Sequence, residues 1–157
     1  MKGRLFALFL CLGFSVAALM IAREVCGALG EPADSVAADR RALSAVQRST
    51  TTYRHYLVKE LVSGSTTVRE YISPDGIVFA IAWNGQTYPD MTPLLGQYAA
   101  EYEEALKQMP RKKGGRRAQV VKTERVVVEK WGHMRNLQGR AYAPALIPSG
   151  VTVDEIK

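Results

Sequence analysis

The stretch REYISPDGIVFAIAWNG, residues 69–85, decides how this chain folds. Its residues 77–83 are all apolar, which predicts a strand that is covered on both faces. Just before them, the sequence Ser-Pro-Asp-Gly at residues 73–76 has Pro where a turn fixes φ and Gly where a positive φ is needed. We therefore predict a hairpin that joins a strand over residues 66–73 to a central strand over residues 77–83.

The residues upstream extend this hairpin into a meander of three strands. Residues 53–62 are rich in aromatic and branched side chains, and SGS at residues 63–65 supplies a turn. Residues 35–47 instead have apolar side chains near one side at helical spacing, with Asp34 or Ser35 as a possible N-cap. We predict a short helix over residues 35–47.

A second helix is predicted downstream, over residues 91–109, with Asp90 as its N-cap and Pro110 at its end. Glu103 and Lys107 form a favourable pair four residues apart on its polar side. Its apolar side chains form one stripe that suits packing on a sheet: Met91, Leu95, Tyr98, Tyr102, Ala105, Leu106 and Met109.

The remaining chain adds strands and an irregular end. The basic segment RKKGGRR, residues 111–117, fits a solvated connection, with an anion-binding loop as the alternative. Residues 118–131 have strand composition with charges on both faces, which favours a sheet edge. A short strand over residues 140–143 precedes an extended tail that packs Leu146, Ile147 and Val151.

Together these elements predict an α+β domain, with an antiparallel sheet of about four to five strands and helices packed on it. The predicted order is a three-strand meander, a crossover helix and further strands. No internal repeat is visible in the sequence.

Residues 1–30 have the composition of a secretory leader. Lys2 and Arg4 precede an uncharged apolar run over residues 5–22, and Ala28 and Gly30 flank Leu29 at its exit. We predict a signal peptide, residues 1–30, that is cleaved after Gly30, with cleavage after Gly27 as the second choice. An uncleaved signal helix that anchors the chain in the membrane is the alternative, because 18 apolar residues approach the length that spans a bilayer.

Both versions place residues 31–157, a single domain, outside the cytoplasm, in the periplasm or the extracellular space. Cleavage removes Cys11 and Cys26, so the exported domain relies on its core in place of disulfides. It keeps 18 basic and 14 acidic residues, a net charge of +4. Export makes nucleic acid a poor partner, and we expect an envelope protein or an anionic envelope polymer. Membrane contact is expected through the leader alone, if it is uncleaved.

Catalytic and metal-binding patterns are missing from the sequence. His55 and His133 stand far apart, and the H-x-x-x-H, C-x-x-C and G-x-S-x-G patterns do not occur. We therefore predict no metal site, no cofactor and no catalytic residue.

One segment is a candidate for binding: GHMRNLQGRAY, residues 132–142, together with the preceding Trp131. Gly132 and Gly139 allow this irregular segment to fold back on itself. Two guanidinium groups suit a carboxylate or a phosphate, and an aromatic face suits a sugar ring. We expect Arg135 and Arg140 to reach solvent on one face, and the candidate binding residues are Trp131, His133, Arg135, Arg140 and Tyr142. Packing of the two aromatic rings in the core is the alternative.

The chain also resembles a known family. Its motifs REYISPDGIVFAIAW, PDMTPLLGQY, GHMRNLQGRAY and PALIPSGV, with ALG at the leader exit, are similar to those of exported proteobacterial proteins catalogued as domain of unknown function 2844. The resemblance covers nearly all of the exported domain in the same order. It implies a bacterial, exported, single-domain protein, and it supplies no activity, cofactor or catalytic residue.

The leading functional hypothesis is a non-enzymatic envelope module that binds a protein or a polymer. A small envelope hydrolase or transferase that uses His133 as its base is the second hypothesis. The third is a domain that resembles peptidase inhibitors. An enzyme would hold His133 near a carboxylate in a deep pocket, whereas a binding module would present a groove.

Overall fold

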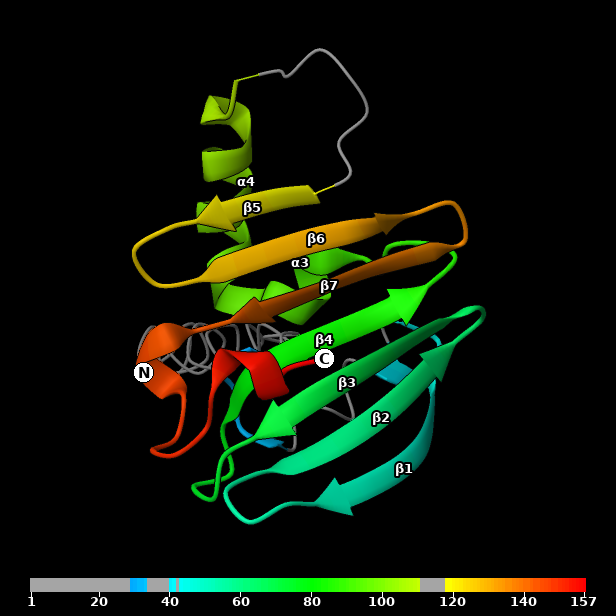
Figure 1. Ribbon diagram of the computed structural model, residues 1–157, viewed down its shortest axis with the longest axis vertical. Coiled ribbons are helices and arrows are strands. Elements are labelled where there is room, and N and C mark those ends of the chain that lie inside the picture. The colour runs from blue at the N-terminus through cyan, green and yellow to red at the C-terminus, as the bar shows by residue number, and fades with distance from the viewer. Residues whose placement is uncertain (1–28, 34–39, 42, 111–117) are drawn as a thin grey trace, which may run out of the picture.

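The computed structural model describes residues 29–33, 40–41, 43–110 and 118–157. Within these residues, seven strands form one antiparallel sheet in the order β1-β2-β3-β4-β7-β6-β5 (Figure 1). The strands are β1 Val46–Thr52, β2 Leu57–Ser63, β3 Thr66–Ile72, β4 Val78–Gly85, β5 Ala118–Lys122, β6 Val127–His133 and β7 Asn136–Tyr142. The predicted α+β class is confirmed, and the predicted four to five strands are corrected to seven. The predicted signal helix lies outside the described residues.

Strand β4 is the central strand, as its apolar sequence predicts. It is the fourth of the seven strands, and all of its residues from Val78 to Trp83 are buried. The predicted turn before it also forms, because the Gly76 N–H donates to the Ser73 carbonyl at 2.9 Å and Gly76 has φ +80°. Two covers bury β4, one on each face of the sheet: helices cover one face, the helix face, and the C-terminal residues cover the other, the tail face.

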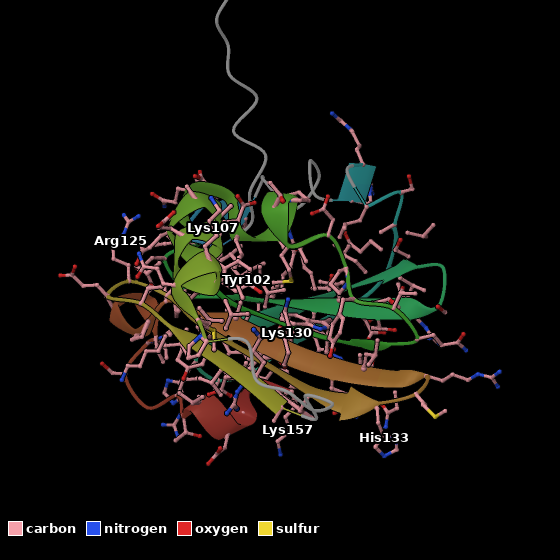
Figure 2. The ribbon with its side chains drawn as sticks, turned by 90° about the horizontal axis from the view of Figure 1, so that it is seen from above. Tyr102, Lys107, Arg125, Lys130, His133 and Lys157 are labelled. Atoms are coloured by element: carbon pink, nitrogen blue, oxygen red, sulfur yellow. The ribbon has the colours of Figure 1, made fainter. Side chains whose placement is uncertain are left out.

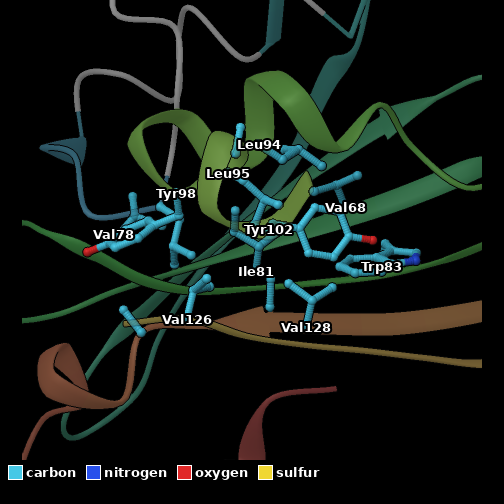
Figure 3. Packing of buried hydrophobic residues seen from close by; sticks show 14 of the residues in the cluster. Val68, Val78, Ile81, Trp83, Leu94, Leu95, Tyr98, Tyr102, Val126 and Val128 are labelled. Atoms are coloured by element: carbon cyan, nitrogen blue, oxygen red, sulfur yellow. The ribbon is translucent and has the colours of Figure 1, made fainter. Parts of the chain in front are cut away.

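The helix face is covered by α3 Met91–Leu95, the 3-10 turn η3 Gly96–Tyr98 and α4 Ala99–Gln108. Asp90 caps α3 as predicted, because its Oδ1 accepts the Thr92 N–H at 2.9 Å. The predicted apolar stripe packs on the sheet against Ile81, Trp83 and Val128 (Figure 3). The predicted continuous helix is interrupted at Gly96, where φ is +48°. The predicted Glu103–Lys107 pair is also wrong, since Lys107 pairs with Glu104 at 3.8 Å.

The tail face is covered by the C-terminal residues, which run through the short turns η4 Pro144–Leu146 and η5 Val153–Glu155 (Figure 1). Ile156 is fully buried against a cluster that includes Tyr56, Tyr71 and Phe79. Leu146, Ile147 and Val151 pack against the same cluster, as the sequence predicts.

Several strands begin or end at residues other than those predicted, because turns without glycine or proline interrupt the predicted strands. Residues 118–131 divide into β5 and β6, because Thr123 Oγ1 and the Thr123 N–H bond to Val126 and turn the chain. The predicted strand over residues 53–62 begins with a similar turn, in which the Tyr53 N–H donates to the Tyr56 carbonyl at 2.8 Å. Strand β5 is the last strand of the sheet, which confirms the edge position predicted for the start of residues 118–131. The predicted strand over residues 140–143 is part of the longer β7.

The predicted helix over residues 35–47 is wrong at its end. Arg40 and Arg41 are helical, but Ser44 has φ +49° and Val46 already belongs to β1. Residues 34–39 and 42 lie outside the described residues. Every residue of β1 is exposed, so this strand lacks the apolar alternation that would have predicted it.

The sheet contains an internal repeat with an offset of 70 residues. The β2–β3 pairing runs from Leu57↔Ile72 to Ser63↔Thr66, and the β6–β7 pairing runs from Val127↔Tyr142 to His133↔Asn136 in the same register. The two meanders lie on opposite sides of β4, and both β3 and β7 are antiparallel to it. A half-turn about the β4 axis therefore relates them and exchanges the two faces of the sheet.

Residues 29–33 are an integral part of this fold. Leu29 is fully buried, and its N–H donates to the Leu94 carbonyl at 3.2 Å. The Gly30 N–H donates to the Val78 carbonyl at 2.8 Å, and Pro32 pairs with Ile77. In the described part of the chain, no helix has the length and apolar character needed to cross a membrane.

Candidate functional site

A symmetric row of charged side chains crosses the tail face. Arg69 of β3 and Arg140 of β7 lie on either side of Ala82, which pairs with both. Each arginine has a glutamate opposite it on the next strand, Glu60 on β2 and Glu129 on β6. The Nε–Oε2 distances are 3.1 Å for Arg69–Glu60 and 2.6 Å for Arg140–Glu129. Both guanidinium groups are therefore neutralised within the sheet.

The C-terminal residues accept further hydrogen bonds from both arginines. Arg140 Nη1 donates to the Val153 carbonyl at 2.6 Å, and Arg69 Nη1 donates to the Lys157 carbonyl at 3.2 Å. Tyr71 Oη donates to the Lys157 carbonyl at 2.8 Å and accepts the Lys157 N–H at 2.9 Å. The row of charges thus holds the last turn of the chain on the sheet.

Two grooves open beside this turn. The larger has a volume of about 620 Å³, and its lining includes Trp131, Asn84 and Asp154. The smaller has a volume of about 400 Å³, and its lining includes Tyr53 and Tyr56. Arg69 and Lys157 line both grooves, so the two volumes meet at these residues.

Two of the five predicted binding residues, Trp131 and Arg140, line the larger groove, and a third, Tyr142, lies beside Arg140. The Arg140 guanidinium carbon lies 5.8 Å from the ring centroid of Trp131 and 6.0 Å from that of Tyr142. The Trp131 Nε1–H donates to Gln138 Oε1 at 3.1 Å, which fixes the indole at the groove wall. Cross-strand pairing and the alternation of side chains bring these residues to one face.

The other two, His133 and Arg135, lie apart from the groove. His133 ends β6, Arg135 belongs to the turn before β7 with φ +65°, and both are exposed. The expectation that Arg135 and Arg140 share one solvent-exposed face is wrong. Arg140 lies within a strand, its side chain is 17% exposed, and it is held by Glu129. Figure 2 shows His133 at the far end of the hairpin.

The two glycines of this segment also have structural roles. Gly132 has φ +100°, and a Cβ there would overlap the Asn136 carbonyl. A Cβ at Gly139 would overlap the Trp83 ring. Their lack of side chains shapes the hairpin and admits an indole, whereas the sequence suggested that they let the segment fold back on itself.

Comparison with known families identifies this chain. A family model described as a protein of unknown function, DUF2844, matches residues 26–156. The chain belongs to the DUF2844 family. No curated protein matches this DUF2844 chain, and no solved structure matches it.

Three tyrosines on the tail face of this DUF2844 domain have raised pKa values. Burial, followed by the charge of Glu155, raises the pKa of Tyr56 to about 12. Burial also raises the pKa of Tyr71 and that of Tyr142. These hydroxyl groups keep their protons at neutral pH and act there as hydrogen-bonding groups.

No set of three His, Cys, Asp or Glu side chains within the described residues could hold a metal ion.

Sequence reasoning missed Arg69, Glu60, Lys157 and Tyr53 as lining residues. The pairing of Glu60 with Arg69 was accessible from the predicted turn, because a hairpin that pairs Ser63 with Thr66 also pairs residues 60 and 69. The position of Lys157 had no such signal, because it depends on how residues 144–157 cross the sheet.

Proposed function

We propose that this protein is an exported, non-enzymatic binding module, and that its tail face binds an extended glycan segment of an envelope polymer. The observation that carries the proposal is the pair of grooves that meet at Arg69 and Lys157. An aromatic side chain stands in each: Trp131, which is partly exposed, and Tyr53, which is 51% exposed. Two adjoining grooves with aromatic side chains suit a linear ligand better than a compact one.

Ring stacking, in place of charge, is the proposed basis of recognition. Both arginines already have carboxylate partners, and Asp154 and Glu155 add negative charge beside Lys157. A strongly anionic polymer therefore gains little here. A sugar ring has apolar faces that suit an indole or a phenol, and hydroxyl groups that suit Asn84 and Asp154.

Export is the second part of the proposal, and it rests on the apolar leader. The burial of Leu29 favours the second of the two predicted exits, after Gly27, because cleavage after Gly30 removes a core residue. The domain then begins at Ala28 and keeps the hydrogen bonds of Leu29 and Gly30.

The proposal is tested by titrating the purified protein with soluble glycan fragments of the envelope while the heat of binding is recorded, and Trp131 fluorescence is followed in the proteins that keep this residue. Trp83 also lines the larger groove but is only 1% exposed, so a ligand in the groove contacts chiefly the ring of Trp131. We expect saturable binding that is lost in Trp131→Ala and weakened several-fold in Tyr53→Ala. Met134→Ala is the matched control, because Met134 is 88% exposed on the same hairpin and outside both grooves.

Equal glycan binding by Trp131→Ala and by the parent protein would refute the proposal. A pull-down from envelope extract separates the alternative partner. If the parent binds no glycan but retains an envelope protein that Trp131→Ala loses, the tail face is a protein-binding surface. The hydrolase hypothesis gains no support from His133, which is exposed and lines neither groove.

A further inference from the structure

A half-buried lysine lies between two tyrosine rings on the helix face, opposite the grooves. Lys130 comes from β6, Tyr102 from α4, and Tyr88 from the connection between β4 and α3. The Lys130 Nζ lies 5.3 Å from the ring centroid of each tyrosine. Figure 2 shows Lys130 below Tyr102, between the sheet and the helix.

The ammonium group of Lys130 has no carboxylate partner within ion-pair distance among the residues that the structure describes. The two rings attract its charge, but their faces are weak acceptors for its three N–H groups. Burial lowers the pKa of Lys130, since removal from water disfavours the charged form. An anion beside Lys130 would stabilise the charged form of the lysine and so offset the cost of its burial.

Two more hydrogen-bond donors on the helix face have no partner among the described residues. Trp83 Nε1 and Tyr102 Oη are buried, and neither has a hydrogen-bond partner in the described part of the chain. Their residues are 1% and 4% exposed. Buried polar atoms of folded proteins nearly always have partners, so two neighbouring exceptions call for an explanation.

Strand pairing brings these donors together. Gly139 of β7 pairs with Trp83 on one side and with Lys130 on the other, so the three residues form one row. The bare backbone of Gly139 admits the Trp83 ring between β4 and β6. In Figure 3 the hydroxyl of Tyr102 points toward the Trp83 indole. An ammonium, a hydroxyl and an indole N–H thus belong to one region of the helix face, and the hydroxyl and the indole N–H have no hydrogen-bond acceptor among the described residues.

We propose that Lys130, Tyr102 and Trp83 form a binding site for one carboxylate group, with Tyr88 at its mouth. A carboxylate brings the opposite charge and two acceptor oxygens, one for the ammonium and one for a neutral donor. Tyr88 is 41% exposed, so it marks the side from which a ligand enters. Lys130, Tyr102 and Tyr88 line neither glycan groove, whereas Trp83 also lines the larger one.

The charge of the neighbouring sequence also favours an anion. Gln119 pairs with Lys130, and the chain just before it, residues 111–117, has five basic residues and no acidic one. These residues are outside the proposed site. These basic residues add to the net positive charge of the chain, which attracts anions in general.

The test follows the two indole N–H signals of the full chain by nuclear magnetic resonance during a titration with sodium acetate. Sodium chloride of equal ionic strength is the reference, and Trp131→Phe assigns the remaining signal to Trp83. We expect the Trp83 signal to shift saturably with acetate and to stay in place with chloride. Lys130→Met should abolish the shift, whereas Lys122→Met, which changes an exposed lysine of β5, should retain it.

Tyr102→Phe removes the unpartnered hydroxyl and keeps the ring. We expect a several-fold loss of acetate affinity with no loss of thermal stability, because this hydroxyl has no partner in the folded protein. A hydroxyl with a purely structural role predicts the opposite, a lower melting temperature with unchanged affinity, and that result would overturn the assignment.

Two further probes distinguish the sources of the carboxylate. A glutamate-rich peptide represents an acidic protein segment, and an oligogalacturonate represents a polymer that carries uronic acids. Tighter binding of either probe than of acetate identifies a carboxylate on that kind of chain, and binding of acetate alone identifies a small free acid. The proposal is overturned if none of the three shifts the Trp83 signal, or if Lys130→Met responds as the parent does.

Discussion

Removal of Ala28, Leu29 and Gly30 should cost this domain a large part of its stability. Leu29 is fully buried against the helix face, and truncation of a buried leucine costs about 2–5 kcal/mol. The N–H groups of Leu29 and Gly30 also lose their bonds to Leu94 and Val78, each worth about 0.5–1.5 kcal/mol. The expected total is about 3–8 kcal/mol, comparable to the whole stability of many domains.

The assay compares two purified proteins, one that begins at Ala28 and one that begins at Glu31, by urea unfolding. Leu29→Ala in the longer protein is the control for the side chain, and it should account for more than half of the difference. Equal midpoints and slopes for the two proteins would refute the assignment of Leu29 to the core. If the longer protein is the stable one, N-terminal sequencing of the protein from its native envelope should return Ala28.

Three other perturbations test the fold. Ile81→Asp places a charge at a fully buried position of β4 and should reduce the free energy of unfolding by several kcal/mol, so an equally stable variant would remove β4 from the centre. Gly139→Ala should destabilise the domain and change the near-ultraviolet circular dichroism of Trp83, because the new methyl group overlaps the indole. Gly64→Ala is the control for the Trp83 signal: its methyl group meets open space, and although φ of +57° makes alanine costly there, the circular dichroism of Trp83 should stay unchanged. Tyr56→Phe should flatten the loss of stability between about pH 10 and 12, measured by urea unfolding at each pH. Burial first, and then Glu155, raises the pKa of Tyr56 from 10.0 to about 12, so the folded state keeps a proton that the unfolded state has lost. That stability is therefore complete below pH 10 and lost as the pH rises toward 12. Tyr53→Phe, an exposed neighbour, is its control, and parallel pH profiles for Tyr56→Phe and the parent would contradict the shift.

The strands that sequence reasoning missed share a physical cause. The turn over residues 123–126 is made by the hydroxyl and the N–H of Thr123, so it has no Gly or Pro to mark it. Strand β1 is exposed along its whole length, and its sequence VQRSTTT shows no alternation. Patterns that arise from burial cannot reveal a strand that buries nothing.

The internal repeat was hidden for a related reason. The half-turn about β4 places equivalent residues on opposite faces, so they meet different partners. Val58 packs under the C-terminal residues, whereas Val128 packs under the helices. These two are the one identical pair between residues 57–72 and 127–142. Equal backbone geometry with unequal surroundings leaves little sequence similarity.

The residues of the candidate site were also predicted only in part from the sequence. Proximity in sequence suggested that five residues from Trp131 to Tyr142 act together. The sheet separates them, because His133 and Arg135 end at a turn while Trp131, Arg140 and Tyr142 share one face. The partners of Arg140 and Arg69 come from the last turn of the chain, and short-range patterns carry no record of that contact.

By itself, the sequence determined the parts of this protein that local chemistry controls. An all-apolar run can be stable only when both faces are covered, so residues 77–83 specified a central strand. Asp90 specified the start of a helix, and the prolines after residue 143 specified an end to regular strands. Tertiary structure alone decided the order of the seven strands, the pairing of Arg69 and Arg140 across Ala82, and the meeting of Lys130 with Tyr102. Those contacts join residues that are far apart along the chain, and their energy depends on which faces are brought together when the sheet closes around β4.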